Sequence, residues 1–193
     1  IEDIAAIRSI PNISIVSPAD GTEVVKAIFA AVNHHESVYL RLTGSSNNPI
    51  VYTEDYDFKI GKAVKIIDGK DISIFANGSM VSIGQSIEKI LKAHQISTEL
   101  INMHTVKPLD EDQIKKSCEK SKLIISLEEH SIIGGLGSSI SEFTSSLNNP
   151  PKLLKFGLRD QYNISGDYTY MLQENNLTSE KIANKILEEL IKK

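Results

Sequence analysis

Short apolar runs along the chain alternate with segments in which apolar residues recur every three or four positions. Runs bounded by Gly, Asn, Asp or Pro are typical of buried strands, whereas the longer spacing is typical of helices with one apolar face. The pattern predicts strands at 13–16, 38–42, 71–76, 98–103, 122–127 and 152–156. Strands that alternate with helices of this length favour an α/β fold, with a three-layer α/β/α domain around a mostly parallel sheet.

Signals for helix starts support this alternation. Asp20 with Glu23, and Asp110 with Gln113, have the spacing of a capping box, in which the first side chain accepts from the backbone of the second residue. Each pair therefore predicts a helix that begins directly after its aspartate. Ser79 follows an Asn-Gly turn and is expected to cap a third helix in the same way.

Apolar residues at helical spacing indicate which helix faces are buried. The helix after residue 20 is expected to bury a face formed by Val24, Ala27, Ile28 and Ala31. A last helix is predicted from about residue 178, with inward-facing Ile182, Ile186, Leu187 and Leu190. Helices with one apolar face of this kind pack against a sheet and leave the opposite face to solvent.

The stretch between the two halves of this pattern has the composition of a linker. Residues 43–57 contain Gly, Ser, Asn, Pro and acidic residues with little periodicity, which is typical of turns and connecting segments. We therefore expect a partial α/β domain at residues 1–52, a linker at 53–60 and a complete domain at 61–193. The smaller block has few strands and is expected to depend on strands outside the chain.

Composition narrows the class of protein. The 193 residues are 40% hydrophobic with a formal net charge of −4, and without a basic stripe we expect no nucleic-acid partner. No apolar run approaches the ~20 residues that span a bilayer, so no membrane association is expected. Cys118, the single cysteine, excludes an internal disulfide and fits a reduced thiol in a cytoplasmic protein. Because the chain begins at Ile1 rather than Met, it is expected to be part of a longer polypeptide.

Two short motifs are weak evidence for a ligand site. His34 and His35 are adjacent, so on a helix their side chains point about 100° apart and do not easily reach one metal ion. We expect them to be polar residues at a helix C-terminus. Residues 134–137, Gly-Gly-Leu-Gly, could present backbone N–H groups to a phosphate. They lack the Lys-Ser/Thr of a P-loop, and a tight turn with close helix packing is expected instead.

Polar side chains near predicted strand ends are better candidates, because open α/β sheets bind ligands at the carboxyl ends of their strands. Glu128 and Glu129 are adjacent on an extended segment, so they face opposite ways and are not expected to form an acid–base pair. Arg41 lies at a strand end, where a guanidinium suits a phosphate or carboxylate. A salt-bridged structural arginine is the alternative. His104 could hydrogen-bond a substrate, or lie exposed on a connecting loop.

The order and spacing of several segments resemble a known family. These segments are Glu-Asp-Ile-Ala at 2–5, Arg-Ser-Ile-Pro-Asn at 8–12, Ser-Pro-Ala-Asp at 17–20, His-Thr-Val-Lys-Pro-Leu-Asp at 104–110, Leu-Glu-Glu-His at 127–130 and the glycine turn at 134–137. Together they resemble the C-terminal half of the transketolase family. The resemblance implies the end of the thiamine-diphosphate-binding (Pyr) domain, followed by a complete C-terminal domain.

The resemblance also implies an activity for the parent enzyme. Transketolases use thiamine diphosphate and Mg²⁺ to move two-carbon ketol units between sugars or sugar phosphates. Their Gly-Asp-Gly turn and their Arg-Glu-His segment, which hold and activate the cofactor, are not in this sequence. We therefore expect no catalytic, cofactor-binding or metal-binding residue in this chain, no cofactor bound to it alone, and no activity alone.

The expected partners are the remaining transketolase domains or an N-terminal subunit, in a homodimeric enzyme. Two alternatives remain open at this stage. One is a non-catalytic module that only assembles the dimer. The other is the beta subunit of a 2-oxo acid dehydrogenase, which shares the Glu-Asp-Ile-Ala segment and the glycine turn.

At two positions this sequence differs from relatives that bind a substrate phosphate with an arginine. Many relatives have Arg-x-x-Arg where this chain has Arg41-Leu42-Thr43-Gly44, and Gly44 replaces the phosphate-binding arginine. Deoxyxylulose-phosphate synthases carry a phosphate-binding arginine where this chain has His104, so the split transketolases are the better match. Arg41 and His104 are the expected substrate-binding residues. We expect the complete enzyme to prefer a substrate without a terminal phosphate, or to hold that phosphate differently, with His104 donating more strongly when protonated below about pH 6.5.

Overall fold

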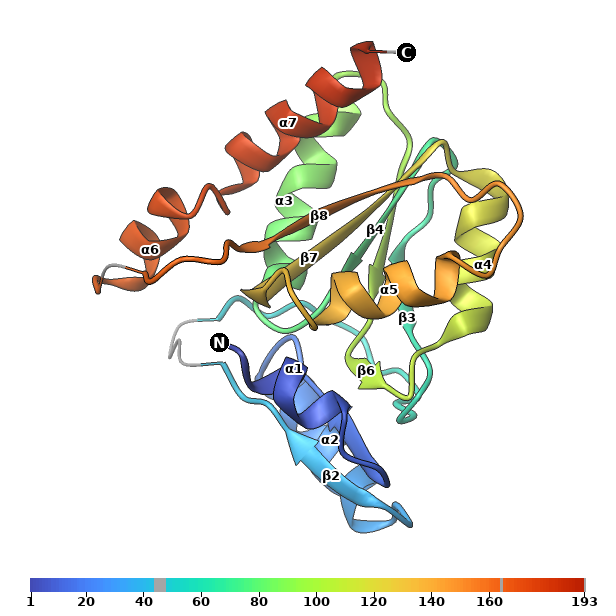
Figure 1. Cartoon of the computed structure of the whole chain (residues 1–193), viewed down its shortest axis with the longest axis vertical. Coiled ribbons are helices and arrows are strands. Elements are labelled where there is room, and N and C mark those ends of the chain that lie inside the picture. Colours follow the sequence, from blue (N-terminus) through green and yellow to red (C-terminus); the bar gives the residue numbers. More distant parts are fainter. Residues whose placement is uncertain (44–47, 164, 193) are drawn as a thin grey trace.

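The computed structural model describes residues 1–43, 48–163 and 165–192, which fold around two β-sheets (Figure 1). The larger sheet has the strand order β3-β5-β4-β7-β8. Its strands are β3 (Val64–Ile67), β4 (Ile72–Ala76), β5 (Thr98–Asn102), β7 (Leu123–Ser131) and β8 (Lys152–Leu158). Only the β3–β5 pair is antiparallel. The prediction of a mostly parallel sheet is therefore confirmed.

Helices cover both faces of the larger sheet (Figure 1). One face packs against α3 (Met80–Ala93) and α7 (Ser179–Ile191), and the other against α4 (Glu111–Lys120) and α5 (Leu136–Thr144). Each face of the sheet packs into its own hydrophobic core, and β4 contributes side chains to both. Ile72 and Ile74 face α3 and α7, while Phe75 faces α4 and α5. This alternation confirms the three-layer arrangement. A short helix that the sequence did not indicate, α6 (Tyr168–Glu174), precedes α7.

The smaller sheet combines strands from both predicted blocks of the sequence. Its order is β2-β1-β6, formed by β1 (Ile13–Val16), β2 (Ser37–Leu40) and β6 (Thr105–Lys107). Helix α2 (Gly21–Val32) connects the parallel pair β1–β2, and β6 pairs with β1 in the antiparallel direction. Helix α1 (Asp3–Arg8) packs on β1 through the fully buried Ile4. Because β6 lies far beyond the predicted linker, the two predicted blocks are joined by strand pairing.

The predicted helix caps are correct for two of the three helices. The side chain of Asp20 accepts from Glu23 N at 2.8 Å, and that of Asp110 accepts from Gln113 N at 3.2 Å. The Ser79 side chain makes no cap hydrogen bond. Its hydroxyl instead donates to the carboxylate of Glu129, so the prediction for Ser79 is wrong because a long-range acceptor competes with the helix backbone.

The buried face of α2 differs from the predicted one. Its fully buried residues are Glu23 and Ala27, whereas Ile28, which was expected to face inward, is 47% exposed. The exposed residues Val25, Ile28, Phe29 and Val32 form what we call the apolar face of α2, with exposed fractions of 47–78%. The i, i+3, i+4, i+7 spacing of these four residues places them on one side of the helix. In α7, by contrast, Ile182 and Ile186 are buried as predicted.

Two observations bear on the environment of the protein. Cys118 is half-buried on α4, and burial raises the pKa of its thiol to about 11, so the sulfur stays protonated and poorly nucleophilic. Within the described part of the chain, no helix combines the length and the apolar character needed to cross a membrane. A cytoplasmic location stays a prediction.

Candidate functional site

The carboxyl ends of the parallel strands in the larger sheet meet the smaller sheet, and we call this place the junction. Backbone hydrogen bonds close it, since Ser17 N donates to His104 O at 2.7 Å and Gly78 N donates to Ser17 O at 3.1 Å. Buried polar side chains gather there, among them Asn77, Asn102, His104, Glu128 and His130. Open α/β sheets bind their ligands at this end, so the junction is the candidate functional site.

Arg41 lies at the junction with its guanidinium already engaged. Its Nε donates to Asp3 Oδ2 at 2.7 Å, and one terminal nitrogen donates to Asp3 Oδ1 at 3.3 Å and to the Glu129 carbonyl at 3.0 Å. Burial alone would raise the pKa of Asp3, but the hydrogen bond and charge of Arg41 outweigh it and lower that pKa to about 2. Arg41 thus ties α1 and β7 to the end of β2. Substrate binding by Arg41 stays a prediction, and it would require displacing Asp3.

His104 is inside the molecule. Its ring is fully buried and stacks on Phe58, with ring centroids 4.2 Å apart, and Nδ1 lies 2.9 Å from Thr105 Oγ1. Burial lowers the pKa of His104 to about 4, so the expectation of a protonated imidazole below pH 6.5 is wrong. The surface-loop alternative is also wrong. Contact between His104 and a substrate stays a prediction, and it would require movement of Phe58.

Glu128 and Glu129 point to opposite sides of β7, as predicted. The fully buried Glu128 accepts from Leu136 N at 2.7 Å and Gly137 N at 2.9 Å, at the start of α5. Burial raises its pKa to about 7, against the opposing effect of these two N–H groups. Glu129 accepts from the hydroxyls of Ser79 and Tyr168. The two carboxylates therefore have separate partners and do not form an acid–base pair.

The glycine turn at 134–137 has the structural role expected for it. Gly134 has a φ of +78°, which favours glycine, and a Cβ on Gly135 would lie 1.9 Å from Glu128 Oε2. The N–H groups that could have met a phosphate are occupied by the carboxylate of Glu128. The turn also reaches α1, because Arg8 donates to the Gly134 carbonyl at 2.8 Å.

A buried cluster around Glu23 was missed by the sequence interpretation. The Glu23 carboxylate accepts from Ala19 N and Tyr56 OH, both at 2.6 Å, and from Asn102 Nδ2 at 2.8 and 2.9 Å. Asn102 also donates to Tyr52 OH at 2.7 Å. Burial raises the pKa of Glu23, with the hydrogen bond from Tyr56 opposing it. The cluster therefore joins α2, the predicted linker and the end of β5.

The position of Glu23 in the sequence is compatible with two roles, a buried residue of α2 and a partner in a capping box. Glu23 lies one helical turn before Ala27, on the buried face of α2, although the same spacing from Asp20 also fits a capping box. The cap forms only in one direction, because the Glu23 carboxylate accepts from Ala19 N rather than from the N–H of Asp20. Two tyrosines in a polar segment gave no indication that this segment is bound to the core.

The described residues do not fit a metal–diphosphate cofactor by themselves. Among them, no three His, Cys, Asp or Glu side chains gather where they could share a metal ion. His34 Nε2 pairs with Ser14 Oγ at 2.9 Å. The carboxylates at the junction are taken by Arg41, by buried hydroxyl and amide groups, and by backbone N–H groups. A cation or diphosphate would have to displace these internal partners.

Comparisons with known proteins agree in pointing to one family. Residues 61–182 match the family model for the transketolase C-terminal domain. Over 99% of its length the chain is 37% identical to a protein of Methanocaldococcus jannaschii named as a transketolase C-terminal section, and over 97% it is 33% identical to one subunit of the apulose-4-phosphate transketolase of Phocaeicola vulgatus. A solved split-gene transketolase, described as an inactive β4 tetramer, superimposes on 97% of the chain with a TM-score of 0.88 and 30% identity.

The chain spans 60% of the length of each of these three relatives. The prediction about the substrate rests on three residues, and the structure describes two of them. Gly44 lies outside the described residues, while Arg41 and His104 are both internal to the junction. The expected substrate preference therefore stays a prediction from the sequence.

Proposed function

The chain belongs to the transketolase family as a C-terminal section, and on this premise we propose that it supplies the C-terminal part of a thiamine-diphosphate-dependent enzyme. That enzyme would transfer two-carbon ketol units between sugars or sugar phosphates. The relatives that carry the name of a transketolase section or of a transketolase subunit support this reaction class. They also favour it over the beta subunit of a 2-oxo acid dehydrogenase.

The proposal rests mainly on one observation, that the polar side chains at the junction are bound to each other. Its buried carboxylates and Arg41 are engaged with partners from the same chain. These residues hold the two sheets in a fixed relation, and when the cofactor is bound elsewhere it would supply the carbanion chemistry. We infer that thiamine diphosphate and Mg²⁺ are held by other domains or by an N-terminal subunit, with the present chain as scaffold beside them.

A further observation supports such a partner. The apolar face of α2 places four large apolar side chains in solvent, and a partner subunit or domain would bury them. The solved relative described as a β4 tetramer has a self-association of its own. For this chain we propose a homodimeric complete enzyme. An assembly module without catalysis is the rival, and turnover by the assembled enzyme separates the two.

The first prediction is that the chain alone does not bind thiamine diphosphate. Isothermal titration of the chain with the cofactor and Mg²⁺ is expected to give no saturable heat, because the junction offers no unoccupied carboxylate set. Titration with Mg²⁺ alone provides the control. A dissociation constant below about 10 μM, equivalent to ~7 kcal/mol of binding free energy, would contradict the proposal.

The second prediction concerns the domain division at residues 1–52, 53–60 and 61–193, which we propose on the sequence pattern. Amides of β4 and β7 are expected to be the most protected in hydrogen exchange, since each strand lies between two others in the larger sheet. Amides of β2, an edge strand of the smaller sheet, are expected to exchange much faster. Equal protection of β2 and β4 would place both sheets in one cooperative unit and remove the boundary.

A further inference from the structure

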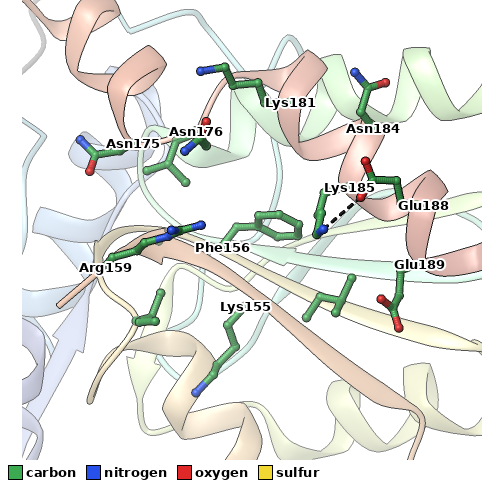
Figure 2. A pocket seen from close by; sticks show the side chains of 14 residues that line it. Lys155, Phe156, Arg159, Asn175, Asn176, Lys181, Asn184, Lys185, Glu188 and Glu189 are labelled. Carbon is green, nitrogen blue, oxygen red and sulfur yellow. Dashed lines mark hydrogen bonds and ion pairs between the residues drawn. The ribbon is translucent and has the colours of Figure 1, made fainter. Parts of the chain in front are cut away.

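A groove lies along the outer edge of the larger sheet, between β8 and the segment that carries α6 and α7 (Figure 2). Its volume is about 590 Å³, which falls in the range of small-molecule sites, roughly 300–1,000 Å³. Strand β8 is the last strand of the sheet. The residues described at the junction do not line the groove. It is therefore separate from the candidate functional site.

The groove has an apolar floor and a polar rim. Phe156 is partly buried and packs on the core beneath α7, and Leu177 is 2% exposed. Figure 2 shows the side chains of Arg159 and Lys185 on the two sides of Phe156, and that of Asn176 higher in the view. An aromatic floor beside cationic and amide groups suits a ligand with one apolar side and one anionic group.

Most of the charged side chains of the groove already have partners. Lys185 Nζ lies 3.0 Å from Glu188, and Glu189 pairs with Lys152 and Lys192 outside the groove. Lys181 Nζ donates to the Gln173 carbonyl at 2.6 Å. Because these side chains are already paired within the protein, they are not by themselves evidence for a bound anion.

Arg159 is different. In the described part of the chain, its guanidinium has no hydrogen bond and no ion pair, and it lies beside Phe156 in Figure 2. Asn176 has a φ of +58° in the turn between α6 and α7. Among the charged residues that line the groove, Lys155 extends away from the others in Figure 2, which leaves three cations, Arg159, Lys181 and Lys185, beside Glu188 and Glu189. The groove therefore has a small excess of positive charge in a chain whose formal net charge is −4.

We propose that this groove binds a small organic phosphate, with the phosphate on Arg159 and the carbon skeleton against Phe156. The planar guanidinium donates two parallel hydrogen bonds to a phosphate, a geometry that a lysine does not offer. The Asn176 amide, which also lines the groove, offers a further donor and acceptor for a polar substituent. The side chain of Lys155 extends on the other side of β8 and is not part of this arrangement.

The test uses phenyl phosphate as the probe, because it combines one aromatic face with one phosphate. In ¹⁵N-resolved NMR titrations of the full chain, amide shifts are expected at 154–159 and 175–185. Arg159→Gln is expected to weaken binding at least tenfold, the loss typical of a charge-assisted phosphate contact, and Arg159→Lys to recover part of it. Arg159 is exposed, and among the described residues its side chain has no hydrogen bond or ion pair that these variants would remove.

Lys116→Gln is the matched control, because Lys116 is an exposed cation on α4 and its replacement removes the same charge. It is expected to leave the affinity unchanged. Equal weakening by Lys116→Gln and Arg159→Gln would reveal non-specific attraction and overturn the site. So would the absence of groove shifts at about 10 mM phenyl phosphate. Binding of an aspartate-rich peptide in the groove without binding of phenyl phosphate would assign the surface to a protein partner instead.

Discussion

Glu23→Ala is expected to destabilise the chain by about 3 kcal/mol or more. The substitution removes one carboxylate from two buried donors, Ala19 N and Asn102 Nδ2, and from the partly buried Tyr56 OH. Each buried donor left without an acceptor costs roughly 1–3 kcal/mol. Because Glu23 lies on α2 while Tyr56 and Asn102 belong to the predicted linker and β5, the loss should also loosen the contact between the two sheets. Urea unfolding followed by circular dichroism measures the change.

Glu174→Ala serves as the control for this prediction. Glu174 is an exposed glutamate on α6, and its replacement is expected to change the unfolding free energy by less than about 0.5 kcal/mol. A Glu23→Ala variant as stable as this control would show that the cluster contributes nothing to folding.

The Glu23 cluster also gives the stability a pH dependence. Burial raises the pKa of Glu23 above its usual value of 4.5, so the folded chain binds this proton more tightly than the unfolded chain. The stabilisation from Glu23 is therefore greatest below pH 4.5 and is lost as the pH rises through the folded-state pKa. Glu23→Gln, which is neutral throughout, should lack this dependence. The difference in unfolding free energy between the wild type and Glu23→Gln is thus expected to shrink as the pH rises.

The second large effect is expected for Gly135→Ala. An added Cβ would lie 1.9 Å from Glu128 Oε2 and 2.7 Å from His130 Nδ1. The Glu128 side chain is fixed by two N–H donors at the start of α5, so moving it breaks those bonds inside the core. A loss of roughly 3 kcal/mol or more is expected from overpacking together with unsatisfied N–H groups, measured by the same urea unfolding.

A double variant identifies the cause of that loss. Glu128→Ala removes the atoms that clash with the new Cβ, so the loss in Gly135→Ala/Glu128→Ala should be clearly smaller than the sum of the two single losses. Gly21→Ala is the control, since a Cβ at Gly21 meets nothing within 4 Å. It is expected to be neutral or slightly stabilising. Strict additivity would mean that Gly135 acts through its backbone and not through the contact with Glu128.

Local rules predicted the parts of the fold that depend on neighbours in sequence. Asp20 and Asp110 cap their helices as expected, because a cap needs only a side chain and the backbone three residues later. The parallel strands and the inward face of α7 also followed from spacing alone. Ser79 failed the same rule because Glu129, fifty residues away, is its acceptor.

The sequence pattern did not predict features that depend on partners far away along the chain. Strand β6 has three residues, and it exists because β1 pairs with it across the molecule. For His104 the local pattern leaves open an exposed loop position or a substrate contact, and only the loop position is wrong, because the ring is buried against Phe58. Glu23 gave the signal of a cap residue, while its partners Tyr56 and Asn102 lie 33 and 79 residues away. For these residues the pairing in space, not the local pattern, decides the role.

We propose that the chain is a part of a ketol-transferring enzyme and cannot act alone. The most direct measurement is turnover of a ketose phosphate donor and an aldose acceptor, with thiamine diphosphate and Mg²⁺ present. It is made on the chain alone and on the chain assembled with the remaining transketolase domains from the same genome. We expect no product from the chain alone and steady formation of the new ketose from the assembly. Product from the chain alone, or an assembled enzyme that binds the cofactor and remains inactive, would contradict the account.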